Sequence, residues 1–147
     1  MAATQIFHSE GRRLLNQIFN GATSKPATLY LLLRTLDGTG GHAADAAAAD
    51  TLTSNLYEVS GGGYARQAIT FNSTNMPESA SGADSILTFA QQTFTFTGTI
   101  TGITHAAVAT TSDNTGKLVA SAPLSTTRNV ANGDQLKVTF VFTLTQG

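Results

Sequence analysis

The sequence predicts a mainly β protein, a β-sandwich or jelly-roll-like barrel with one short N-terminal helix. Threonine, a β-branched residue that favours strands, occurs 24 times among the 147 residues. About six to eight short segments with strand patterns are separated by turn signals, and one segment near the start has a convincing helical pattern. This length fits a single domain, residues 1–147, around one hydrophobic core.

The helix is predicted over residues 9–20. Ser9 is placed to cap its start, and Gly21 is placed to end it. Four apolar side chains form one stripe at helical spacing, namely Leu14, Leu15, Ile18 and Phe19. We expect this stripe to cover an open side of the sheet; the alternative is that it reaches into a neighbouring subunit.

The first long strand is predicted over residues 27–36. Its central residues, 29–33, are apolar at both odd and even positions. Because side chains of a strand alternate between two faces, this pattern indicates a strand that is buried on both faces. The second face would then be covered by the helix or by another chain.

A long loop is predicted over residues 37–56. Connections in compact domains usually have about 4 to 6 residues, and this one is far longer and rich in Gly, Ala and Asp. Residues 43–50 have helical propensity from alanine but no large side chains to anchor a helix. We therefore expect a partner to order this loop, which makes it a candidate arm between subunits.

The second half of the chain is predicted to consist of strands and turns. A polar turn through residue 84 is followed by alternation with Leu87 and Phe89 at odd positions but Phe94 and Phe96 at even ones. Because the side-chain period of a strand is two, this change near Gln91-Gln92 requires a β-bulge or a break between strands. The strands of this half are predicted at residues 64–72, 102–111, 117–124 and 135–145, the last with Val141 as the exception to its alternation.

The composition excludes several kinds of chemistry and partner. Cysteine is absent, which removes disulfides, thiol nucleophiles and thiolate metal sites. Charged residues are 12% of the chain, about half the usual share, and the net charge is −1, so no nucleic acid is expected. No apolar run approaches the roughly 20 residues of a membrane helix, and no signal peptide is predicted. We therefore expect a soluble protein made in a cytoplasm, whose weakly charged surface favours association.

No catalytic, cofactor-binding or metal-binding residues are predicted. The histidines His8, His42 and His105 are scattered and lie in no metal-site or triad context. His42 and Asp45 form an i, i+3 pair that a short helix could present to a metal, but a solvated loop is the favoured interpretation. His105 is expected to be a structural residue within a strand.

Three short motifs also have structural interpretations. Ser112-Asp113-Asn114 matches one element of penicillin-recognising serine enzymes, but their Ser-x-x-Lys and Lys-Thr-Gly elements are absent, which leaves a turn. Gly61-Gly62-Gly63 lacks the ending of a phosphate loop and predicts a turn with positive φ. Arg12-Arg13 is interpreted as a solvated helix face. The absence of tryptophan and the presence of only three tyrosines disfavour a carbohydrate site.

Residues 58–71 read EVSGGGYARQAITF, and this run resembles a segment of small structural proteins of tailed-phage virions. Other parts follow in the order of that family, and the resemblance covers most of the chain. These parts are the short helix, a strand like residues 26–30, a strand like 103–108, a segment like 118–124 and the turn Asn132-Gly133-Asp134. The loop at residues 37–56 departs from the family pattern.

The resemblance implies a virion structural protein that is not an enzyme and needs no cofactor or small-molecule substrate. We expect first a capsid decoration (cement) protein, a homotrimer that binds the major capsid protein and stabilises the assembled head by mass action and multivalency. The alternative is a tail or tail-fibre structural module. The expected location is the virion, on the capsid surface rather than the tail.

Overall fold

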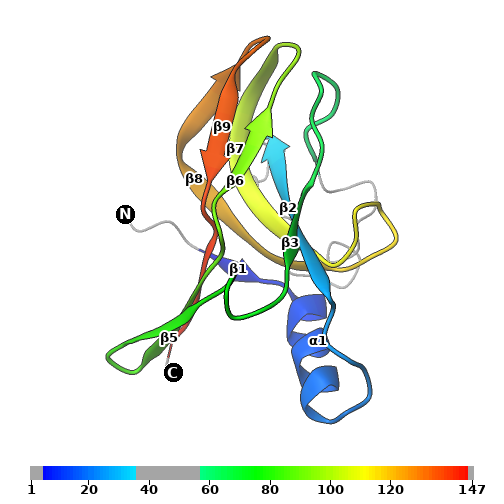
Figure 1. Cartoon of the computed structure of the whole chain (residues 1–147), viewed down its shortest axis with the longest axis vertical. Helices are drawn as coiled ribbons and strands as arrows, with labels where there is room; N and C mark the ends of the chain where they lie inside the picture. Colours follow the sequence, from blue (N-terminus) through cyan, green and yellow to red (C-terminus); the bar gives the residue numbers. More distant parts are fainter. Residues whose placement is uncertain (1–4, 36–56, 146–147) are drawn as a thin grey trace.

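The computed structural model describes residues 5–35 and 57–145. These residues form a mostly β structure with one short helix, arranged as a β-sandwich-like fold (Figure 1). The elements are β1 (Ile6–Phe7), α1 (Ser9–Phe19), β2 (Thr28–Thr35), β3 (Gln67–Thr70), β4 (Glu78–Ser81), β5 (Asp84–Thr88), β6 (Gln92–Thr95), β7 (Ile100–Ala109), β8 (Leu118–Val130), β9 (Gln135–Val138) and β10 (Val141–Leu144).

The larger layer is a five-stranded antiparallel sheet in the order β1-β8-β7-β2-β3. The strands β7 and β8 are the longest and curve side by side through the upper part of the view in Figure 1. The strand predicted at residues 117–124 therefore continues to Val130. Its exposed second half carries no burial signal, and it is held by pairing with β7, where Val130 lies opposite Ile100.

The second layer is built from a three-stranded and a two-stranded sheet, and β5 and β10 of the first continue into β6 and β9 of the second. The strands run in the order β10-β5-β4 in one sheet, and β6 pairs with β9 in another. Between the pairs Thr88–Val141 and Gln92–Val138, residues 89–91 lie opposite residues 139–140. The Phe89 amide donates to the Phe140 carbonyl at 2.9 Å across this junction. Three residues opposite two are a β-bulge, which confirms the break predicted near Gln91-Gln92.

The segment between β3 and β5 was predicted as a polar turn, and this prediction is wrong in part. Residues Glu78–Ser81 form β4, which pairs with β5 in a hairpin. All four side chains of β4 are exposed, so the segment has no apolar alternation. Its strand conformation depends on backbone hydrogen bonds to β5, which leave no side-chain pattern in the sequence.

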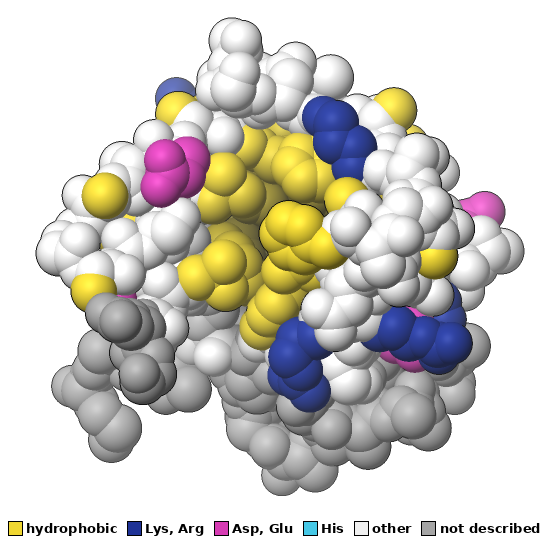
Figure 2. Space-filling view, turned by 90° about the horizontal axis from the view of Figure 1, so that it is seen from below, with side chains coloured by type: hydrophobic (Ala, Val, Ile, Leu, Met, Phe, Trp, Pro, Cys, Tyr) yellow, Lys and Arg dark blue, Asp and Glu magenta, His cyan; other side chains and the backbone are white. Residues whose placement is uncertain are grey.

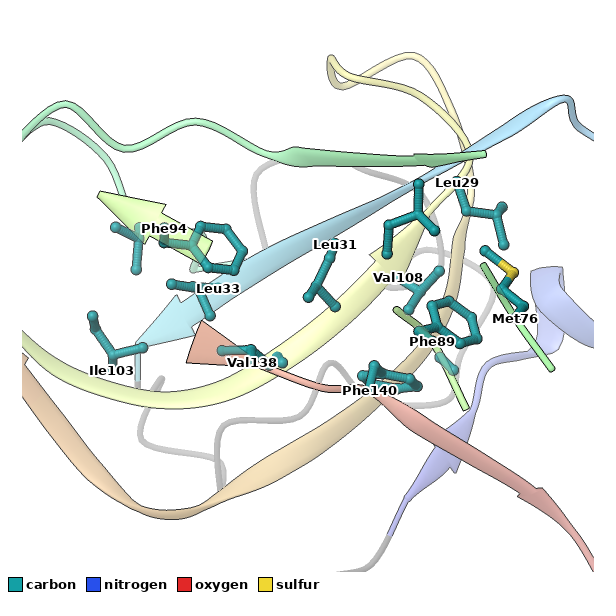
Figure 3. Packing of buried hydrophobic residues seen from close by; sticks show 14 of the residues in the cluster. Leu29, Leu31, Leu33, Met76, Phe89, Phe94, Ile103, Val108, Val138 and Phe140 are labelled. Carbon is teal, nitrogen blue, oxygen red and sulfur yellow. The ribbon is translucent and has the colours of Figure 1, made fainter. Parts of the chain in front are cut away.

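The main core lies between the two layers (Figure 3). The odd residues of β2, Leu29, Leu31 and Leu33, face aromatic side chains of the second layer. Val138 and Phe140 are buried while Val141 is 44% exposed, so the predicted alternation and its exception are both confirmed. Phe89 and Phe140 contact each other with ring centroids 5.5 Å apart.

The opposite face of β2 is also buried, as predicted. Leu32 forms a second, small cluster with Ala107, Ala109 and Leu118, all fully buried. Arg34 on the same face is likewise buried. The loop predicted at residues 37–56, with His42 and Asp45, lies outside the described residues.

The helix begins and ends close to the predicted positions, but its start is not capped by Ser9. His8 occupies the N-cap position and makes no side-chain capping bond, because its Nε2 lies 2.9 Å from Ser121 Oγ on β8. Gly21, with φ of 74°, follows the helix end as predicted. α1 packs against β8, and a Cβ atom at Gly11 would overlap the Val119 carbonyl oxygen. This close approach sets the position of the helix at one end of the sandwich.

Candidate functional site

Residues 58–71, the segment that resembles the phage proteins, contain a glycine turn at residues 61–63. This turn lies beside Thr97, just after the end of β6. Gly61, Gly62 and Gly63 all have positive φ, as predicted. The Thr97 amide donates to the Gly62 carbonyl at 2.7 Å, and a Cβ atom at Gly63 would lie 2.6 Å from Thr97 Oγ1. Both the backbone conformation and the close approach therefore require glycine here.

The turn brings three polar side chains together, and we call Glu58, Tyr64 and Arg66 the polar network. Tyr64 Oη donates to Glu58 Oε1 at 2.7 Å and accepts from the Leu33 amide at 3.1 Å. Arg66 forms a bidentate pair with the Glu58 carboxylate, with Nε 2.8 Å from Oε1. The tyrosine ring stacks on Phe94 of the second layer, with centroids 5.9 Å apart. This engagement explains why β3 starts at Gln67 and not at residue 64.

Arg66 uses every donor of its guanidinium group. Besides the two bonds to Glu58, Nη1 donates to the carbonyls of Thr111 and Asp113, and Nη2 donates to Asn114 Oδ1 at 2.8 Å. A guanidinium group has five N–H donors, and all five have acceptors here. The side chain is 6% exposed. Arg66 thus ties the β7–β8 turn to the start of β3.

The surroundings of Tyr64 and Arg66 favour the protonated form of both side chains. Burial raises the pKa of the Tyr64 phenol well above its ordinary value, and the Glu58 carboxylate raises it further. Hydrogen bonds to Glu58 raise the pKa of the Arg66 guanidinium. The phenol therefore stays protonated and the guanidinium charged. The arrangement acts as a structural anchor between distant segments.

The turn at Ser112-Asp113-Asn114 is present as predicted. Asp113 Oδ1 accepts from the amide and the hydroxyl of Thr115 at 2.9 and 2.6 Å. These hydrogen bonds lower the pKa of the Asp113 carboxyl. The motif is therefore used to shape the turn that Arg66 holds.

Among the described residues, His105 lies within β7, His8 directly precedes α1, and the basic pair Arg12-Arg13 lies on α1. His8 and His105 are both buried, and His105 Nδ1 lies 2.8 Å from Thr104 Oγ1 within β7. Arg12 and Arg13 are exposed on α1, in agreement with a solvated helix face. Arg12 donates to the Phe7 carbonyl, and Arg13 lies 3.6 Å from Glu10.

Within residues 5–35 and 57–145, which the structure describes, no three His, Asp or Glu side chains form a group that could hold a metal ion. No helix in these ranges combines the length and apolarity that a membrane crossing requires.

The end of the sandwich that α1 covers contains an apolar hollow of about 210 Å³. Its walls include α1 and the paired strands β5 and β10. Figure 2 shows its yellow side chains at the centre of this end, with charged groups of both signs at the rim. The helix contributes Leu14, Leu15 and Ile18, three of the four residues in the predicted stripe. The second layer contributes Leu87, Phe89, Phe140, Phe142 and Leu144. These three residues thus face the interior of their own chain, in line with the first expectation, whereas Phe19, the fourth residue of the stripe, is exposed.

A family model described as podophage GP4 fiber I protein gp80 matches residues 8–142. The chain belongs to this podophage fibre family. The match runs from the residue before α1 into β10, so it includes the polar network and all lining residues of the apolar hollow except Phe7 and Leu144. No curated protein matches the chain.

Membership of the fibre family makes the chain a bacteriophage structural protein and a virion component. It supports the tail or tail-fibre alternative better than the capsid decoration protein that we expected first. The family is one of structural fibre proteins, and nothing in the match indicates catalysis.

The sequence pointed to residues 58–71, the segment that contains the polar network. It did not predict the hydrogen bonds and the ion pair among Glu58, Tyr64 and Arg66. Glu58 and Arg66 are separated by eight residues and belong to no regular element, so no helical or strand spacing links them. The apolar hollow was also missed, because its lining comes from segments far apart in the chain. The helical stripe was the one signal that pointed to it.

Proposed function

We propose that this chain is a structural subunit of the podophage fibre, held in the virion by packing against neighbouring protein subunits. The observation that carries the proposal is the fibre-family match over residues 8–142. That match spans nearly every described element, so the whole domain, and not a short shared motif, supports it.

The surface chemistry supports a role in packing. The net charge is −1, so copies of the chain approach one another with little electrostatic repulsion. Several large apolar side chains are exposed to solvent, namely Phe19, Tyr57, Val141 and Leu144. Apolar groups at the surface of a structural protein gain free energy when a neighbour covers them.

Self-association as a homotrimer belongs to this proposal. A β-sandwich with internally anchored turns is a rigid unit, and many weak contacts between such units add up in a symmetric assembly. The major capsid protein would be a direct partner only if the chain sits on the head.

Gold-labelled antibodies against the purified chain, applied to intact particles, test the location. We expect label at the tail or its fibres and none on the faces of the head. Antibodies against the major capsid protein provide the control for labelling of the head. Label spread over the head faces would reject the fibre proposal in favour of capsid decoration.

Particles that lack this chain provide a second test. We expect them to package DNA into normal heads but to lack fibre density in electron micrographs. Co-sedimentation of purified chain with fibreless heads separates the two locations, since a fibre subunit should stay in the supernatant and a decoration protein should pellet with the heads.

A further inference from the structure

The apolar hollow opens at the same end of the molecule as the last turn of α1. Figure 1 places the end of the helix at the bottom of the molecule, and Figure 2 views the hollow from that side. Phe19 is the last residue of α1 and is 80% exposed. It directly follows Ile18, which lines the hollow. An open apolar hollow and an unburied aromatic ring therefore lie close together on one surface.

Both features are costly in isolation. An exposed phenylalanine gives up most of the free energy that burial of its ring would provide. The hollow likewise leaves side chains such as Leu87 and Phe142 without neighbours on one side. A second copy of the chain can satisfy both features. Its hollow offers an apolar surface to the Phe19 ring of the first copy, and its own Phe19 ring can fill the hollow of the first copy.

We propose that Phe19 of one copy packs into the apolar hollow of a second copy. Since the ring and the hollow lie at the same end, two copies that meet there exchange their rings reciprocally, in a two-fold contact that is distinct from the contacts within a homotrimer. The charges around the hollow permit this approach. Glu78 lines it, while Lys25 lies over the ring of Phe71, another lining residue, at 4.9 Å from the centroid. Both signs of charge are present, so the two mouths do not repel each other.

The expected contact is small. Two phenylalanine rings and the surfaces they cover amount to roughly 600 to 1,000 Å² of buried area, whereas stable interfaces bury about 1,200 Å² or more. The contact should therefore be weak between free chains and stronger where a particle holds many copies together. This inference does not depend on where in the virion the chain is located.

Sedimentation equilibrium between about 1 μM and 1 mM, the range in which weak contacts titrate, tests the proposal. The wild-type chain, with a monomer mass of 15.2 kDa, should show a mass that rises with concentration. Phe19→Ser should raise the dissociation constant about tenfold or more, the effect expected for an aromatic residue at the centre of a contact. Ala131→Ser, a polar substitution at an exposed position outside the hollow, should leave it unchanged.

Filling the hollow tests the other half of the contact. Ser85 lines the hollow and is half-buried, so Ser85→Trp should block entry and weaken association to a similar extent. Ser79→Trp adds the same bulk to the exposed strand β4, outside the lining, and should have no effect. Circular dichroism spectra identical to wild type establish that each variant is folded.

A photo-reactive benzophenone side chain at position 19 gives a direct readout. In a mixture with isotope-labelled chain, it should cross-link to hollow residues such as Leu87 or Leu144 of the labelled copy. A larger assembly that also depends on Phe19 and Ser85 supports the same contact. A wild-type chain that stays monomeric at about 1 mM, or association that neither Phe19→Ser nor Ser85→Trp weakens, overturns the proposal.

Discussion

Arg66 shows how a single residue can organise one end of this fold. Its guanidinium group joins the Glu58 carboxylate to three acceptors of the β7–β8 turn. Lysine would keep the positive charge but has neither the planar fork nor five donors. The charge alone therefore does not explain the presence of arginine, whereas the geometry does.

Arg66→Lys should destabilise the protein by about 1 to 3 kcal/mol, because lysine cannot keep the part-buried bidentate pair with Glu58 and also donate to the Thr111 carbonyl. The measurement is the free energy of unfolding from urea titration. Arg128→Lys at an exposed position of β8 is the control and should change the free energy by less than about 0.5 kcal/mol. Equal effects of the two substitutions would show that Arg66 acts only through its charge.

Tyr64 should give the protein a pH dependence in the alkaline range. Its pKa is raised in the folded state, chiefly by burial, so folding favours the protonated phenol. The contribution of this pKa shift to the free energy of unfolding is fully present below about pH 10, the pKa of tyrosine in the unfolded chain. It is lost as the pH rises above that value towards the pKa of the folded state. The wild-type free energy of unfolding should therefore fall more steeply above about pH 10 than that of Tyr64→Phe, by up to about 1.4 kcal/mol per pH unit. Parallel curves for the two proteins would contradict the assignment.

The β-bulge between β5–β6 and β9–β10 is the element on which the second layer depends. One extra residue on the first strand changes which positions point inward, from Phe89 before the bulge to Phe94 after it. Without it, the side chains on one side of the junction would point away from the core. The bulge thus allows one long hairpin to cover the whole core.

Deletion of Gln91, an exposed residue within the bulge, should destabilise the protein by at least about 3 kcal/mol. The deletion would force the buried rings of Phe94 and Phe96 towards solvent or break the pairing with β9. Gln91→Ala, which keeps the backbone residue, should change stability by less than about 0.5 kcal/mol. The comparison of both variants by urea unfolding separates the backbone effect from the loss of the side chain.

At the scale of the whole molecule, stability comes from the contact between the two layers. Phe140 lies where β9 meets β10 and is 3% exposed, packed on Phe89 and facing the residues of β2 (Figure 3). At one end, the polar network ties the layers together through Tyr64 and Phe94. At the other end the layers separate around the apolar hollow.

Phe140→Ala should destabilise the protein by about 3 to 5 kcal/mol, the usual cost of truncating a buried phenylalanine. The adjacent Val141→Ala, on the exposed face, should cost less than about 1 kcal/mol. Thermal and urea unfolding both measure the difference. Similar losses for the two variants would mean that the faces of this strand are assigned wrongly.

The sequence by itself determined those features that leave a local pattern. The alternation ending in β10, the parity change at Gln91-Gln92 and the doubly apolar centre of β2 follow from the strand period of two. The glycine turn at Gly61–Gly63 follows from the backbone freedom of glycine. Each depends on neighbours in the chain, so each was predicted correctly.

Only the tertiary structure decided the features that depend on distant segments. The strand β4 and the second half of β8 are held by backbone pairing, which leaves no side-chain pattern. The pairing of Arg66 with the β7–β8 turn and the apolar hollow between α1 and β10 exist because the fold brings separated segments together. Hydrogen-bond partners and cavities are properties of that three-dimensional arrangement, so the spacing of residues along the chain does not record them.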